Sequence, residues 1–196
     1  GKIPVIDPST GATLCEAPLA SDLEVDRAVR AAHRAFNDPA WSKLKPAQRA
    51  LLLLRLADAV EAVADEIAAI ETLDNGMTIG FSRFFNVATG IDCLRYYAGW
   101  ATKLNGETPQ LSMPGEWHAY TLKRPVGVTA LIVPWNVPFG ITIAKIAPAI
   151  AAGCTVVLKP AEQTPLTALR LAKLVEAVGF PPGVINIVVG TGAAAG

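Results

Sequence analysis

The stretch VGVTALIVPWNVPFGITIAKIAPAIAAGCTVVLKPAEQTP, residues 126–165, decides the fold. It holds two apolar runs, 126–133 and 155–159, on either side of an apolar segment of helical length at about 139–152. Continuous apolar strands are typical of a parallel sheet that helices cover on both faces. The sequence therefore predicts an α/β fold in which a parallel sheet carries flanking helices.

The same alternation continues towards the carboxyl end of the chain. A helix is predicted at about 165–178, and a third apolar strand, VINIVV, at 184–189. Residues 1–124 show a different pattern. VIDPSTGATLCEAPL predicts two short strands around a turn. Three helices and one alternating strand or hairpin arm are then predicted at about 22–36, 46–75, 79–104 and 116–124.

Composition excludes several classes of protein. The 196 residues include 17 basic and 17 acidic side chains, so no basic excess favours nucleic acid or a membrane surface as a partner. No apolar run approaches the length that crosses a bilayer, and the first residues lack the apolar core of a signal peptide. Three widely spaced cysteines fit free thiols in a reducing compartment, so the expected location is cytoplasmic.

Polar residues follow the first two predicted strands of the sheet, where ligands bind in parallel sheets. In dinucleotide-binding folds an acidic residue near the end of the second strand accepts hydrogen bonds from a ribose, and Glu162 stands three residues beyond the second strand here. Lys159, at the strand end, could reach the same ribose or a phosphate. The alternative is a surface ion pair before the next helix. The glycine cluster from Gly190 to Gly196 is a weak signal, and no GxGxxG follows the first strand.

Two more residues are candidates for catalysis. The amide of Asn136 can donate a hydrogen bond to an oxygen that gains negative charge, although asparagine is also common in turns. Lys145 lies on the apolar face of its predicted helix. It is either a proton-relay group or a side chain that extends to the surface.

No nucleophile is evident. Cys15, Cys93 and Cys154 are all interpreted as small packing residues. The two histidines, His33 and His118, have no partner at the spacing of a metal site or a catalytic triad, so no metal is expected.

Several long motifs, in order, resemble NAD(P)-dependent aldehyde dehydrogenases over essentially the whole chain. They are DPSTG (7–11), ETLDNG (71–76), CLRYYAGWA (93–101), YTLKRPVGV (120–128), PWNVP (134–138), LKPAEQTPLTAL (158–169) and GFPPGVINIVVG (179–190). In that family a cysteine thiolate attacks the aldehyde, hydride passes to the nicotinamide, and a glutamate-activated water releases a carboxylic acid.

The resemblance assigns roles to residues of this chain. Asn136 would hold the oxyanion of the thiohemiacetal, and Lys145 would belong to a proton relay. NAD is the implied cofactor, with NADP as the alternative, because the Glu162 carboxylate would repel the 2′-phosphate of NADP. The implied cofactor-binding residues are Val133, Pro134, Trp135, Asn136, Lys159, Pro160, Ala161, Glu162, Gly192 and Gly196.

The resemblance also implies a domain organisation. Residues 1–113 would be the helical part of a cofactor-binding domain, 114–124 an oligomerisation strand, and 125–196 a Rossmann-like βαβαβ unit that is truncated at Gly196. The expected partners are a small aldehyde and further copies of the chain, as a dimer or tetramer.

Two departures from the family pattern stand out. Val137 replaces the aromatic residue that usually follows PWN. The nucleophilic cysteine and the general base would both lie beyond Gly196. The expected function is aldehyde oxidation by a longer protein, and the alternative is a non-catalytic cofactor-binding or oligomerisation module.

Overall fold

Three parallel strands form the centre of the molecule in the computed structural model, which describes residues 1–196. They are β3 (Val128–Ile132), β4 (Thr155–Lys159) and β5 (Ile185–Ile187), with β4 in the middle. The register pairs Ile132 with Lys159, so β3 and β4 end side by side. The predicted α/β fold with a parallel sheet is confirmed.

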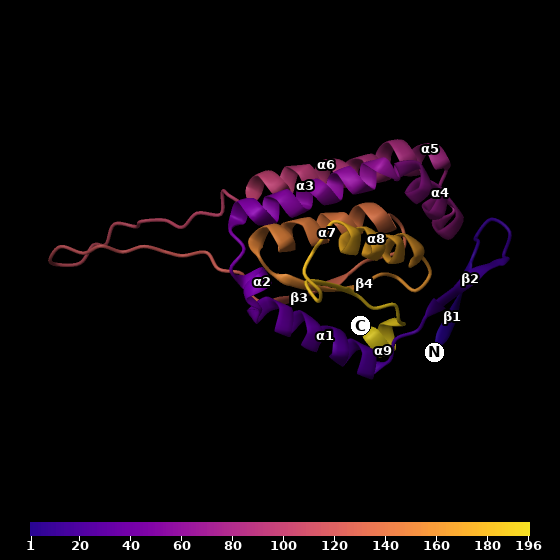
Figure 1. Cartoon of the computed structure of the whole chain (residues 1–196), viewed down its shortest axis with the longest axis horizontal. Coiled ribbons are helices and arrows are strands. Elements are labelled where there is room, and N and C mark those ends of the chain that lie inside the picture. The colour runs from indigo at the N-terminus through magenta and orange to yellow at the C-terminus, as the bar shows by residue number, and fades with distance from the viewer.

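Two crossover helices connect these strands, α7 (Pro138–Ala152) and α8 (Leu166–Ala177). Proline in the first turn suits the start of α7, because the N–H that it lacks would have no partner inside the helix. Figure 1 shows α7 and α8 on one face of the sheet and α1 (Asp22–Asn37) on the other. The sequence predicted all three helices to within a few residues.

The amino-terminal part adds a β-hairpin and a further helical layer beyond α7 and α8 (Figure 1). The hairpin turns at Asp7, as predicted, and Ser21 and Glu24 form a capping box at the start of α1. The remaining elements are β1 (Lys2–Ile6), β2 (Thr13–Pro18), α2 (Pro39–Ser42), α3 (Pro46–Ala62), α4 (Ala64–Asn75), α5 (Ile79–Phe81), the π-helical η1 (Ser82–Val87), α6 (Ala88–Trp100) and α9 (Gly192–Ala195).

Two of the predicted helices are interrupted. The helix predicted at 46–75 breaks at Val63, where the backbone leaves the helical region, and α4 begins anew with Asp65 and Glu66 in its first turn. Acidic residues are favourable there, so this pair was a sequence signal for a second helix start. The helix predicted at 79–104 contains η1 and ends at Trp100.

Residues 116–124, predicted as a strand or hairpin arm, form no strand and instead belong to an extended arm. Residues 102–126, between α6 and β3, leave the body and return as two extended segments, which together form the arm (Figure 1). One backbone hydrogen bond joins them, from the N–H of Thr121 to the carbonyl of Glu107 at 2.9 Å. A two-stranded hairpin without further partners is marginal, so alternation of side chains alone does not produce a ladder here.

One large core joins the helical layer to the sheet. It includes fully buried side chains from α3, α6, α7 and α8, and the Trp41 indole donates to the carbonyl of Gly153 at 3.0 Å. Gly90 of α6 lies against Phe139 of α7, where a Cβ would stand 2.9 Å from the ring. None of the helices combines the length and hydropathy that crossing a bilayer requires.

Candidate functional site

The ends of β3 and β4 place the PWN and KPAE segments at one edge of the sheet. The N–H of Val133 donates to the carbonyl of Lys159 at 2.9 Å, which extends the ladder by one bond beyond Ile132. Trp135 and Glu162 line the same cleft, of about 570 Å³. The two segments, separated by a whole crossover in the sequence, therefore share one surface.

Lys159 forms an ion pair with Glu162, which lines this cleft. The Lys159 ammonium lies 3.2 Å from the Glu162 carboxylate and also donates to the carbonyl of Pro160 at 3.3 Å. The lysine side chain is only 7% exposed, so this is not a pair of freely solvated surface charges. A hydrogen bond from its own backbone N–H, and secondarily Lys159, lower the pKa of Glu162 against the opposing effect of burial. An ionised carboxylate is thus available to accept hydrogen bonds.

The turn after β3 presents its side chains outward. Pro134, Trp135 and Asn136 are all exposed, and the Asn136 amide has no hydrogen-bond partner within the chain. Its two N–H groups are therefore free to donate to a ligand. Val133 is buried beneath them, and so are Pro160 and Ala161 on the neighbouring segment.

Lys145 lies on the exposed side of α7, next to exposed Ala144. The interpretation that it belongs to the apolar face is wrong, and its exposure fits both a proton-relay group and a side chain that extends to the surface. Thr142, Ile143, Ile146 and other residues form the buried face instead. A helix as apolar as α7 hides this distinction, because exposed alanine looks like core in the sequence.

Gly192 and Gly196 lie at the two ends of α9, which follows β5 at the same edge of the sheet. Gly192 begins this short helix, and the N–H of Gly196 donates to its carbonyl at 3.1 Å. A Cβ at Gly192 would meet nothing within 4 Å, so open space borders this backbone.

Sequence reasoning missed the two carboxylates at the end of α4. Glu71 is fully buried and accepts hydrogen bonds from Ser82 Oγ at 2.7 Å and from the N–H of Phe139 at 3.0 Å. Phe139 is in the first turn of α7, so Glu71 caps that helix from outside. Asn86 also connects Glu71 to the first turn of α7. Its side-chain N–H donates to the Glu71 carboxylate, and its side-chain oxygen accepts from the N–H of Gly140 at 3.0 Å. Burial raises the pKa of Glu71.

Asp74 caps the start of α8, as Glu71 caps the start of α7. Its carboxylate accepts from the N–H of Leu166, the first residue of α8, at 2.8 Å. Burial, with a further contribution from Glu71, raises the pKa of Asp74 to about 7. The sequence did carry a signal: two acidic residues in the last turns of a helix oppose the helix dipole and need another reason to be there.

The three thiols differ in their surroundings. Cys15 is exposed on β2, which corrects its interpretation as a packing residue. Cys154 is buried, and Cys93 is partly buried on α6, where desolvation raises the pKa of its thiol. A raised pKa leaves less thiolate, the nucleophilic form, so Cys93 is unsuited to attack on a carbonyl.

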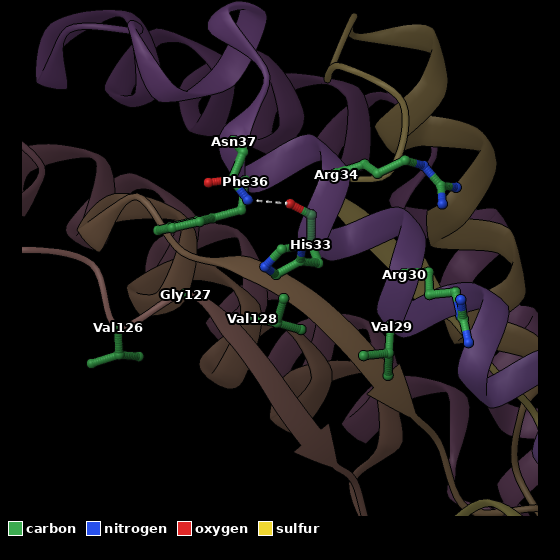
Figure 2. Close-up of a pocket in the computed structure, with 9 residues that line it drawn as sticks. All are labelled: Val29, Arg30, His33, Arg34, Phe36, Asn37, Val126, Gly127 and Val128. Carbon is green, nitrogen blue, oxygen red and sulfur yellow. Dashed lines mark hydrogen bonds between the residues drawn. The ribbon is translucent and has the colours of Figure 1, made fainter.

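A second hollow, of about 660 Å³, lies at the amino end of β3, away from the PWN and KPAE segments. It is formed between α1 and residues 126–128. Figure 2 shows the guanidinium groups of Arg30 and Arg34 pointing away from Val126 and Val128. Its charged groups therefore do not converge on the hollow, in contrast to the cleft beside Glu162.

The chain is similar in sequence to known proteins of one family. The model of the "Aldehyde dehydrogenase family" matches residues 1–196. A phenylacetaldehyde dehydrogenase from Pseudomonas fluorescens is 48% identical over 196 residues, covering 98% of this chain and 39% of that enzyme. A mitochondrial aldehyde dehydrogenase from Equus caballus is 46% identical over 194 residues, covering 98% and 38%.

The structural comparison agrees. An aldehyde dehydrogenase from Bacillus cereus, solved as an NAD⁺ complex, superposes with a TM-score of 0.96 at 40% identity and covers 100% of this chain and 39% of its own. This chain thus spans about two fifths of the length of these relatives. With a family model over its whole length and this degree of identity, the chain belongs to the aldehyde dehydrogenase family.

Proposed function

We propose that the full-length protein containing this chain oxidises an aldehyde to a carboxylic acid with NAD, and that this chain supplies the cofactor cleft and the oxyanion-binding amide. One observation carries the proposal. The PWN turn and the KPAE segment meet at one sheet edge, where Ile132 is the register partner of Lys159 and one cleft touches Trp135 and Glu162.

The residues at this end of the sheet fit a dinucleotide. Glu162 is half-buried and ionised, as a carboxylate that accepts hydrogen bonds from two ribose hydroxyls must be. The Lys159 ammonium beside it retains donor capacity, since it has three N–H groups. The open space at Gly192 lets a ligand approach the backbone there. The Glu162 charge favours NAD, because it would repel the 2′-phosphate of NADP.

The catalytic work of this chain is assigned to Asn136 and Lys145. NAD, when it is bound, would accept the hydride. The free N–H groups of Asn136 would donate to the oxygen of the aldehyde as a thiolate adds to its carbon, which stabilises the negative charge that develops. Lys145, exposed on α7, would exchange protons with the general base. The thiolate and the base would come from parts of the full-length protein outside residues 1–196.

Two finer assignments concern the substrate and the assembly. Val137 is smaller than an aromatic residue and would leave more room beside Asn136 than an aromatic side chain, and one relative is a phenylacetaldehyde dehydrogenase. An aldehyde with an aromatic or bulky apolar tail is therefore the proposed substrate. The arm exposes Trp117, Tyr120 and Leu122 by 63%, 63% and 62%, so it is proposed to contact another copy.

The test is NADH formation from NAD and phenylacetaldehyde by the full-length protein, with Asn136→Ala beside the wild type. Loss of an oxyanion donor should lower kcat by about a hundredfold, because such donors act mainly in the transition state. The Kd for NAD should change less than about twofold, since the donor faces the aldehyde. Asn37→Ala is the matched control: this amide bonds to the carbonyl of His33 on α1.

The outcomes separate the two functions. An equal loss in kcat and in NAD affinity would remove the oxyanion role from Asn136. If the wild type forms no NADH from any aldehyde but still self-associates, the non-catalytic oligomerisation module is the better description.

A further inference from the structure

The turn that carries Asn136 is fixed at both of its ends. On one side, the N–H of Val133 bonds to the carbonyl of Lys159 at 2.9 Å and belongs to the sheet. On the other, the carbonyl of Val137 accepts from the N–H of Ile141 at 3.1 Å and belongs to α7. The three residues between, 134–136, are exposed and have neither ladder nor helix to hold them.

A single hydrogen bond reaches this turn from the rest of the protein. The side-chain amide of Asn75 donates to the carbonyl oxygen of Trp135 at 2.6 Å. That oxygen belongs to the peptide unit between Trp135 and Asn136. Because a peptide unit is planar, holding its oxygen also fixes the plane from which the Cα of Asn136 projects. The bond therefore limits the directions that the Asn136 side chain can take.

Asn75 itself stands on a rigid base. It is the last residue of α4, and the same end of α4 is tied to both crossover helices. Glu71 accepts from the N–H of Phe139 at 3.0 Å, and Asp74 accepts from the N–H of Leu166 at 2.8 Å. Because α4 is held against α7 and α8, the Asn75 amide has a fixed position, and its hydrogen bond holds the turn at 134–136 relative to these helices.

We propose that Asn75 is a positioning residue for the Asn136 amide, and that it acts through the carbonyl oxygen of Trp135. The inference rests on the oxyanion role proposed above and adds the residue that preorganises it. Catalytic donors are effective because they are already oriented when charge develops. Without the bond from Asn75, Asn136 still has its N–H groups, but it has to be oriented during each turnover.

The experiment is a double-mutant cycle in the full-length protein with Asn75→Ala, Asn136→Ala and the double variant. Asn75→Ala should lower kcat by about ten- to a hundredfold, as misplaced catalytic groups do. The loss in kcat should exceed any rise in the KM for NAD, because Asn75 lines the cleft beside Trp135 but bonds to the turn and not to Glu162. Once Asn136 is alanine, Asn75→Ala should cost nothing more, because its effect passes through that amide.

A second variant separates the hydrogen bond from packing. Asn75→Asp keeps the shape of the side chain but replaces the donor with a carboxylate, so it should lose as much kcat as Asn75→Ala. Asn37→Ala, which removes a comparable amide-to-carbonyl bond on α1, should leave kcat unchanged.

Each outcome has a definite meaning. Additive losses in the double variant, or an Asn75→Asp variant with the wild-type rate, overturn the positioning role while the oxyanion role stands. An Asn136→Ala variant as active as the wild type removes the oxyanion role, and the inference about Asn75 with it.

Discussion

Asp74 is the residue whose ionisation the fold changes most. Its pKa is about 7 in the folded chain against 3.8 for an ordinary aspartate, so the folded state holds a proton that the unfolded state has released between these values. Stability from this group is therefore fully present below about pH 4 and is lost as the pH rises through about 7. The change amounts to about 4 kcal/mol at most.

We expect Asp74→Asn to remove this dependence, because the amide oxygen still accepts from Leu166 N–H and does not titrate. Denaturant unfolding of both proteins from pH 4 to 8 measures it. The free energy of unfolding of the variant should increase relative to that of the wild type as the pH rises. Asp92→Asn, at an exposed position of α6, controls for the loss of one acidic side chain. Parallel pH profiles for the wild type and Asp74→Asn would contradict the assignment.

At the scale of elements, η1 and α7 pack closely enough that one methyl group decides stability. A Cβ on Gly140 would overlap Asn86 Oδ1, and this buried amide is held by hydrogen bonds on both sides. Gly140→Ala should therefore lower the free energy of unfolding by about 1–3 kcal/mol. Gly99→Ala, exposed on α6 with only Lys103 Nζ nearby, should raise it by about 1 kcal/mol.

Thermal unfolding of the two alanine variants measures this contrast. The same substitution should shift Tm in opposite directions, because helix propensity acts at Gly99 and steric overlap dominates at Gly140. Equal stabilisation by both would show that η1 and α7 are not in the close contact described here.

Elements with a strong local period could be predicted from the sequence. The runs at 126–133 and 155–159 are continuously apolar, which predicts two buried parallel strands. Neighbouring parallel strands end side by side, so the closeness of the segments that follow them could also be predicted. The capping of α7 by Glu71 could not be predicted in this way, because 68 residues separate Glu71 from Phe139. Residues 116–124, expected as a strand or hairpin arm, form no strand for a related reason, since a strand requires a partner that its own alternation does not supply.

At the scale of the whole molecule, the arm is the part without a place in the core. Its apolar side chains are exposed along an extended segment that projects from the body (Figure 1). Extended segments with unpaired backbone groups readily pair with another chain. We therefore expect the chain to self-associate, and the contact to include the arm.

Charges on the arm should prevent this association without affecting the core. Tyr120 and Leu122 lie two residues apart and so share a face of the extended segment. Sedimentation should give an oligomer for the wild type and a monomer for Tyr120→Glu/Leu122→Glu, with an unchanged Tm for the core. Leu23→Glu/Val29→Glu, at exposed positions of α1, adds the same charge elsewhere and should leave the oligomer intact. If both double variants dissociate equally, repulsion by net charge is the cause and the arm has no specific role.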